Sequence, residues 1–497
     1  MVTVFLYLCI RIFNFYFIKM LFNSIAFLLF FPIVCVLYFC IPASRLRMRN
    51  LFLLVASYYF YMNWKPVYAL LLLTSTVVTY LAAIGIAHFE EKAKKKACLI
   101  ASLVLNLAIL FLFKYYNFFA ENIEMVLQAS GLGIQLPEFK LLLPVGISFY
   151  TFQALGYSID VYYGTTKVER DFPTYALFVS FFPQLVAGPI ERSNNLLPQF
   201  KKVHRLDYES VMAGVRIMVW GYFMKLVLAD RCSLYVDSIF NHVSMHNGGS
   251  YLLASLMFPF QLYGDFAGYS FIAIGAARVL GFQLMENFRR PYFFSVSVQD
   301  YWKRNHISLT SWFMDYVYYP MVGSSTNLWW WCTAIFITFF ISGFWHGAAW
   351  TYVVSFSIFG FYLVICTLKE RPQRRFEKKY GLKKKEWWLW LNRILTFLLV
   401  VVALVFFRAN NLHDALTVIA GIFTHPGVPF PEYANFIAIA MALAILMVKE
   451  FAEEYQWKFR VADSPSWLVR HVYLILMICY IILFGVLGGD QFIYFQF

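Results

Sequence analysis

The stretch ISGFWHGAAW, Ile341 to Trp350, separates two long apolar runs at 328–345 and 350–368. Each run is close to the roughly 20 apolar residues with which a helix crosses a hydrocarbon core of about 30 Å. The stretch therefore predicts two membrane helices joined by a short turn. His346 is its one ionisable residue, and ionisable side chains inside membranes are rare and usually functional.

Composition extends this interpretation to the whole chain. Of 497 residues, 61% are hydrophobic and 14% are charged, whereas soluble domains carry about 25% charged residues. The sequence predicts an all-α polytopic membrane protein with about 11–12 membrane helices, plus re-entrant or interfacial helices, around a central funnel or tunnel. The apolar runs cover 21–41, 51–63, 67–87, 97–119, 141–163, 172–187, 209–230, 251–281, 328–345, 350–368, 388–407, 434–449 and 469–488.

The net charge of +14 is gathered in short basic clusters between apolar runs, at 42–50, 88–96 and 369–385. This distribution is typical of the cytoplasmic loops of membrane proteins, so it predicts a lipid bilayer as partner and no nucleic acid. With these loops inside, an odd number of crossings must lie between 120 and 368, where six apolar runs occur. At least one of those runs is therefore expected to be re-entrant or interfacial.

Proline and glycine interrupt two of these runs. The breaks lie in LLPVGISFY, at Pro144 and Gly146, and in FFPQLVAGPIER, at Pro183, Gly188 and Pro189. Broken helices at membrane depth are tolerated where protein or a water-filled cavity takes up the freed backbone groups. These two segments are therefore the best candidates for the re-entrant helix, and their breaks imply a cavity.

The first 19 residues differ from the rest of the chain. Arg11 interrupts their apolar run and no small-residue cleavage site is present, so they make a poor signal peptide. The apolar run that begins at Met20 is more typical of a first membrane helix. We expect residues 1–19 to be an extra or non-native extension, and residues 20–497 to form a single integral-membrane domain.

His346 has two interpretations. It is either a structural histidine bonded to a neighbouring helix, or a functional base. Gly343 and Gly347 permit close backbone approach, and Trp345 and Trp350 can wall a narrow apolar slot. An apolar setting favours the uncharged ring, which can take a proton from a hydroxyl.

The segment YWKRNHISLTSWFMDYVYYP, Tyr301 to Pro320, supplies a second candidate. Trp302, His306 and Leu309 recur near helical spacing, which predicts one amphipathic helix at the membrane interface. His306 falls on its apolar stripe, one turn from Trp302. It precedes His346 by enough chain for a turn and one span, so both histidines can face one cavity.

Two further polar positions remain open. Asp265 lies in an apolar helix, where it either pairs with Tyr269 or Arg278, or lines the cavity and orients a histidine. Glu191, with Arg192, follows a Gly-Pro break and belongs either to a solvated loop or to the mouth of the cavity.

Several catalytic motifs are absent from the sequence: HExxH, GxSxG, a Walker A loop and GxGxxG. We predict no metal site. A neutral base without a nucleophile of its own suits acyl transfer between two bound substrates.

Four motifs together resemble those of the membrane-bound O-acyltransferase family: FPQLVAGPIER, YGDFAGYSFIAIGAARVLGF, ENFRRPYFFSVSVQDYWKRNHISLTSW and ISGFWHGAAWTY. The similarity is to the bacterial branch that contains the alginate O-acetylation and teichoic-acid D-alanylation membrane proteins. It extends from Met20 to the C-terminal FIYFQF.

The resemblance implies that His346 is the family's near-invariant histidine in a catalytic tunnel, and that His306 is the second family position. Asn305 replaces an aromatic residue of the branch, and the segment after Pro320 is short. The residues expected to line or support the site are Trp345, Trp350, Trp302, Asn305, Asp265, Arg304 and Gly347.

The resemblance also implies a location in the bacterial cytoplasmic (inner) membrane, with no bound cofactor. The expected acyl donor is acetyl-CoA or an acyl-carrier thioester, which would make an acyl-carrier protein a partner. The other expected partners are a periplasmic or extracellular acetylation protein and a polysaccharide acceptor. His346 would take the hydroxyl proton and return it to the departing thiolate, while His306 would orient the thioester or stabilise the oxyanion. The alternatives are D-alanyl transfer to teichoic acid and a transporter or flippase of a lipid-linked precursor, with His346 and Asp265 as proton relays.

Overall fold

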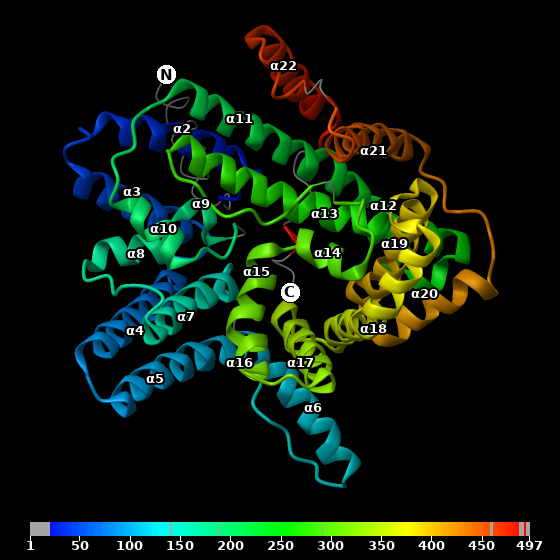
Figure 1. Cartoon of the computed structure of the whole chain (residues 1–497), viewed down its shortest axis with the longest axis horizontal. Coiled ribbons are helices and arrows are strands. Elements are labelled where there is room, and N and C mark those ends of the chain that lie inside the picture. The colour runs from blue at the N-terminus through cyan, green and yellow to red at the C-terminus, as the bar shows by residue number, and fades with distance from the viewer. Residues whose placement is uncertain are drawn as a thin grey trace, which may run out of the picture. The chain divides into compact units, whose positions relative to one another are not determined.

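The computed structural model is helical throughout, and no strand occurs in the residues that it describes, which are 20–139, 142–186, 188–290, 292–457, 461–486 and 492–493. Eight helices in these ranges are long and apolar enough to cross a membrane (Figure 1). They are Tyr68–His88, Lys92–Ala129, Tyr208–Phe240, Leu328–His346, Trp350–Tyr380, Glu386–Arg408, Tyr433–Glu454 and Trp467–Phe484. Two shorter apolar helices, Ile25–Cys40 and Leu412–Thr424, accompany them. The prediction of an all-α polytopic membrane protein is confirmed, whereas the expected extension 1–19 lies outside the described residues.

Contacts divide the chain into two compact units, and the first holds the residues up to Met218 together with Tyr269–Met285. Its helices are α2 (Ile25–Cys40), α3 (Leu46–Met62), α4 (Tyr68–His88), α5 (Lys92–Leu110), α6 (Tyr116–Ala129), α7 (Ile147–Tyr163), α8 (Phe172–Ser180), α9 (Phe182–Leu185) and α10 (Ser193–Phe200). Within this unit α4 packs against α5 and α7, and α3 packs against α8. The π-helical turn η2 (Phe111–Tyr115) connects α5 to α6 without a break.

The two predicted interruptions lie in this unit. Helix α7 begins only at Ile147, after Gly146, whose φ of 73° lies in the left-handed region that favours glycine. Helix α8 ends at Ser180 and α9 begins at Phe182. The nine residues of α8 span roughly 14 Å, about half of a hydrocarbon core. The breaks are confirmed, and the re-entrant path of these segments stays a prediction.

The second unit holds Val219–Gly268 and the residues from Glu286 onward. It contains α12 (Asp230–Phe240), α14 (Val298–Arg304), α15 (Ile307–Phe313), α16 (Tyr319–Val322), α17 (Leu328–His346), α18 (Trp350–Tyr380), α19 (Glu386–Arg408), α20 (Leu412–Thr424), α21 (Tyr433–Glu454) and α22 (Trp467–Phe484). Helices α11 (Tyr208–Tyr222) and α13 (Gly248–Val279) contribute residues to both units. The prediction of a single membrane domain over 20–497 stays a prediction.

Helices α17 and α18 form a tight hairpin in the second unit (Figure 1). At Gly343 the helices are so close that an added Cβ would lie 2.9 Å from the Cα of Val353. Helix α18 ends where Gly381 adopts a φ of 62°, a common way to terminate a helix. Both spans predicted around the opening stretch are confirmed, and α18 continues well past the predicted end.

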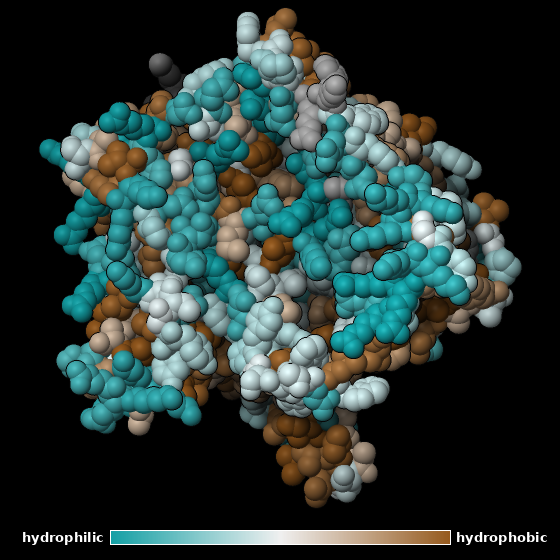
Figure 2. Space-filling model, in the orientation of Figure 1, coloured by the Kyte–Doolittle hydropathy of each residue, from teal (hydrophilic) through white to brown (hydrophobic). Residues whose placement is uncertain are grey.

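Large apolar side chains face outward on many helices, as lipid contact requires. Leu70 on α4 is 63% exposed and Ile475 on α22 is 60% exposed. Helix α6 exposes Met125 and Val126 to similar extents, and Figure 2 shows this part of the chain as an apolar projection. In a soluble protein such surfaces would be association sites, so they support the membrane assignment.

Candidate active site

His346 is the last residue of α17 and is buried, at 3% exposure. Its ring stacks on Phe356 of α18, with ring centroids 4.2 Å apart and planes at 26°. The close approach of the hairpin at Gly343 makes this stacking possible, because α18 could not pack so near a larger residue. Gly347 then continues as extended backbone, and a Cβ there would overlap the ring of Tyr352. The glycines thus fix where the histidine lies.

His306 lies at a helix break, and the prediction of one continuous helix from Tyr301 to Pro320 is wrong. Helix α14 ends at Arg304, and α15 begins at Ile307. Between them His306 has a φ of 46°, a conformation that non-glycine residues rarely adopt. The break places the imidazole at the corner between two short helices, and its side chain is 2% exposed.

Asn287, which the sequence analysis missed, stabilises this corner. Its Oδ1 atom lies 3.1 Å from Nδ1 of His306 and accepts from the hydroxyl of Ser308 at 2.8 Å and from the Ser308 N–H at 3.3 Å. Its carbonyl oxygen accepts from the N–H of Ile307 at 2.9 Å. An N–H can only donate, so the oxygen of the Asn287 amide faces this side, and Nδ1 of His306 is the donor. In the neutral ring, Nε2 of His306 then carries the lone pair.

The two histidines face one small cavity of about 20 Å³, roughly the space of a single water molecule. Their ring centroids are 6.3 Å apart. The other lining residues are Leu262, Tyr263, Phe266, Phe288, Tyr292, Tyr301, Trp302, Asn305, Phe356, Phe359, Leu404 and Phe407. Burial lowers the pKa of His306 well below its usual value, because an apolar setting disfavours the imidazolium. The pair is therefore a dry site that holds at least one neutral imidazole.

The predicted supporting residues divide into two groups. Trp302 and Asn305 line the cavity, and Trp345 packs its edge against both histidine rings. Asn305 accepts a hydrogen bond from the hydroxyl of Tyr292 at 3.1 Å, so this amide is held in place at the cavity. The structure does not bring the other predicted residues into this cavity.

Arg304 pairs with Asp300 at 3.1 Å on the same helix. Trp350 is 46% exposed, and its ring contacts Phe344. Asp265 lines a different cavity. Among the described residues these three positions therefore support the histidine pair at most indirectly.

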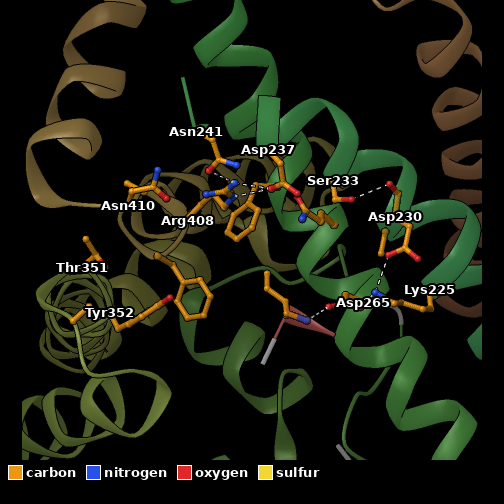
Figure 3. Close-up of a pocket in the computed structure, with 17 residues that line it drawn as sticks. Lys225, Asp230, Ser233, Asp237, Asn241, Asp265, Thr351, Tyr352, Arg408 and Asn410 are labelled. Atoms are coloured by element: carbon orange, nitrogen blue, oxygen red, sulfur yellow. Dashed lines mark hydrogen bonds and ion pairs between the residues drawn. The ribbon is translucent and has the colours of Figure 1, made fainter. Parts of the chain in front are cut away.

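That second cavity is larger, about 380 Å³, and mostly polar. Lys225, in the π-helical turn η3 (Phe223–Ala229), lies between Asp230 at 2.7 Å and Asp265 at 2.6 Å (Figure 3). Asp265 also accepts from the N–H of Ile493 at 2.7 Å. The partner of Asp265 is thus Lys225 on a neighbouring helix, which corrects the expectation of Tyr269 or Arg278. Asp265 lies outside the lining of the histidine cavity, so the alternative that it orients a histidine stays a prediction.

Glu191, in the first unit, is 1% exposed, so the solvated-loop interpretation is wrong for this residue. Its carboxylate accepts from the N–H of Met285 at 2.5 Å and from the amide of Asn195 at 2.7 Å. Burial raises its pKa to about 7, against a smaller lowering by these hydrogen bonds. Glu191 therefore holds two chain segments together inside that unit.

Sequence reasoning missed Asn287, Lys225 and Phe407. Asn287 lies within the motif ENFRRPYF, and the role of its amide can be recognised only once its contact with His306 is known. Lys225 was the better signal, because a lysine within the apolar run 209–230 requires a partner.

Comparisons with known proteins identify the family of the chain. Residues 57–408 match the model of the membrane-bound O-acyltransferase family. The chain is 33% identical to a Pseudomonas putida protein named "Probable alginate O-acetylase AlgI", over 96% of this chain and 100% of that protein. It is 33% identical to a peptidoglycan O-acetyltransferase of Helicobacter pylori, over 81% of this chain and 80% of that protein. A teichoic acid D-alanyltransferase of Bacillus subtilis is 25% identical over 73% of this chain and 89% of its own length. With two buried histidines on one cavity and a family match across both units, the chain belongs to the membrane-bound O-acyltransferase family and is a multi-pass membrane O-acyltransferase.

Proposed function

We propose that this chain transfers an acetyl group from a cytosolic thioester towards hydroxyl groups of a cell-surface or exported polysaccharide. The observation that carries the proposal is the pair of buried imidazoles, 6.3 Å apart, on one small dry cavity. Acetyl is favoured over D-alanyl because the relatives named as O-acetylases reach 33–36% identity, whereas the named D-alanyltransferases reach 25–28%. The donor is acetyl-CoA or an acyl-carrier thioester.

His346 acts as the general base in this proposal. It takes the proton of the acceptor hydroxyl while the hydroxyl oxygen forms a bond to the thioester carbonyl carbon. When the carbon–sulfur bond breaks, the proton passes from the imidazolium to the thiolate. Ester and thiol are formed, and no proton is gained or lost by the protein.

His306 has a different part, which its contact with Asn287 determines. Its Nδ1 donates to Asn287, so in the neutral ring Nε2 accepts a hydrogen bond and cannot donate one. This arrangement suits orientation of a hydroxyl or thiol at the cavity. It does not suit stabilisation of an oxyanion, which requires a donor.

The membrane sides follow from the basic connections. With the lysine-rich connection between α18 and α19 in the cytosol, the turn at 347–349 and the end of α19 lie on the outer side. The donor then arrives from the cytosolic side and the acyl group leaves on the other. A periplasmic or extracellular partner protein would complete delivery to the polysaccharide, and the bacterial cytoplasmic membrane is the location that this route requires.

Replacement of each histidine tests the proposal. In His346→Ala and His306→Ala cells, ester-linked acetate on surface polysaccharide should disappear, while the polysaccharide itself is still exported. His413→Ala, an exposed histidine on α20, is the matched control and should leave the acetate unchanged. Loss of export in the two site variants would instead indicate a transporter or flippase.

The donor is tested separately with isolated membranes. Labelled acetyl-CoA should transfer its label to an ester product in wild-type membranes and not in His346→Ala membranes. Labelling only from a D-alanyl carrier protein would replace acetyl with D-alanyl in the proposal.

A further inference from the structure

Two cavities of the second unit share one lining residue, Phe407. One is the small cavity with both histidines, and the other is the polar cavity of about 380 Å³. Helix α13 contributes to both in a similar way, because Asp265 lines the polar cavity and its neighbour Phe266 lines the small one. Phe407 is thus the side chain that borders both the larger space and the cavity of the histidines.

The ring of Phe407 is buried among other rings. It is 3% exposed, with its centroid 5.8 Å from that of His346 and 4.9 Å from that of Tyr352. The next residue, Arg408, donates to Asp237 at 2.6 Å and to Asn241 at 3.2 Å (Figure 3). The end of α19 is therefore fixed by polar contacts, and movement of the partition falls to the Phe407 side chain.

The polar cavity lies at one end of the helices. It is lined by residues at the start of α18 and the end of α19, opposite the basic connection between these helices. Asn241 and Asn410 at this end are exposed. The cavity thus opens on the side from which, under the proposed function, the acceptor arrives.

The charges of this cavity indicate which groups can enter it. Its lining includes the cations Lys225 and Arg408 and the carboxylates Asp230, Asp237 and Asp265. Both cations already pair with carboxylates, at 2.6–2.7 Å. Three carboxylates against two cations leave an excess of one negative charge, which disfavours an anionic group and accepts a neutral one.

We propose that Phe407 is a movable partition between an acceptor-entry cavity and the histidine cavity, and that it admits an uncharged hydroxyl group while excluding bulk water. This inference rests on the proposed acyl transfer and adds a specificity-determining residue to it. The closed ring leaves space for about one water beside the histidines, so a hydroxyl group must displace the ring. When the ring is absent, water attacks the thioester instead, and free acetate and thiol are formed in place of an ester.

The test uses the full chain in membranes or detergent, with acetyl-CoA as donor, and measures thiol release without an acceptor. Phe407→Ala should raise this hydrolysis severalfold. Phe406→Ala, the same change at the adjacent, partly exposed residue that lines neither cavity, should not. Phe407→Trp should leave hydrolysis low and reduce transfer, which keeps the test valid if the alanine variant does not fold.

Charge selection is measured with glycerol and glycerate, two small hydroxyl acceptors that differ in charge. Glycerol should be acetylated roughly tenfold faster than glycerate. The carboxylate of glycerate is repelled by the one excess negative charge of the cavity, at a separation near 10 Å and an effective dielectric constant of about 20. Equal hydrolysis by Phe407→Ala and Phe406→Ala would overturn the partition, and equal or faster transfer to glycerate would overturn the charge assignment. Wild-type protein that turns over neither acetyl-CoA nor a carrier thioester would instead overturn the proposed function.

Discussion

Asn287 offers the sharpest test of how the histidine pair works, because its side-chain oxygen sets the orientation of His306. Asn287→Asp keeps an acceptor in the same place and adds a negative charge. A charge near 4 Å at an effective dielectric constant of about 20 stabilises an imidazolium by about 4 kcal/mol, or roughly 3 pKa units. The pKa of His306, which burial holds well below its usual value, should then rise.

The direction of the pH dependence is set by the charge of His306. In the wild type, burial lowers the pKa of His306 well below its usual value, so its ionisation should not limit acyl transfer around neutral pH and above. In Asn287→Asp, His306 is cationic below the raised pKa and its Nε2 becomes a donor, so transfer should fall at low pH and recover as pH rises through that value. Because the new carboxyl can take the same proton, the measured value belongs to the pair.

The assay is the rate of acetyl transfer from acetyl-CoA between pH 6 and 9, for wild type, Asn287→Asp and Asn287→Ala. Asn287→Ala removes the acceptor altogether, so its rate should be low at every pH, by about 10²-fold or more if His306 loses its orientation. Equal rates for Asn287→Ala and wild type, or a pH profile of Asn287→Asp that matches wild type, would refute the reasoning.

Three other substitutions test the packing around the site. Lys225→Met leaves Asp230 and Asp265 buried without their cation and should cost about 3–5 kcal/mol of stability. Adding Asp230→Asn and Asp265→Asn to this variant should restore part of the lost melting temperature. A melting temperature of Lys225→Met equal to that of the wild type would contradict the buried triad. Gly343→Ala places a methyl group 2.9 Å from the backbone of α18 and should lower the melting temperature by the equivalent of about 1–3 kcal/mol, together with the transfer rate. Glu191 has a folded pKa of about 7 against an unfolded value near 4.3, so its contribution to stability should fall as pH rises from about 4.5 to 7. In Glu191→Gln the melting temperature should change less with pH across that window. Parallel curves of melting temperature against pH for both proteins would argue against the raised pKa.

The sequence predicted most of the membrane helices because their signal is local. Continuous apolar runs set the bounds of α17 and the start of α18, and Gly347 marks the turn between them. His346 could be located for the same reason, since a lone histidine beside glycines and tryptophans is visible without any partner.

The break at His306 could not be predicted, because it depends on a distant contact. Trp302, His306 and Leu309 keep a helical spacing, and the amide that stabilises the corner, Asn287, lies 19 residues earlier in the chain. The partner of Asp265 was missed in the same way: residues of the same helix were considered, whereas Lys225 comes from another helix.

The Lys225 triad also has a consequence for how the chain enters the membrane. A charged residue at the centre of an isolated helix costs about 2.5–3.5 kcal/mol to insert. Asp230 is synthesised on the same continuous helix as Lys225, but Asp265 emerges from the ribosome on a later one. Insertion of the later helix is therefore cheapest while the earlier one is still beside the translocon, because Asp265 can then pair with Lys225 before either segment enters lipid.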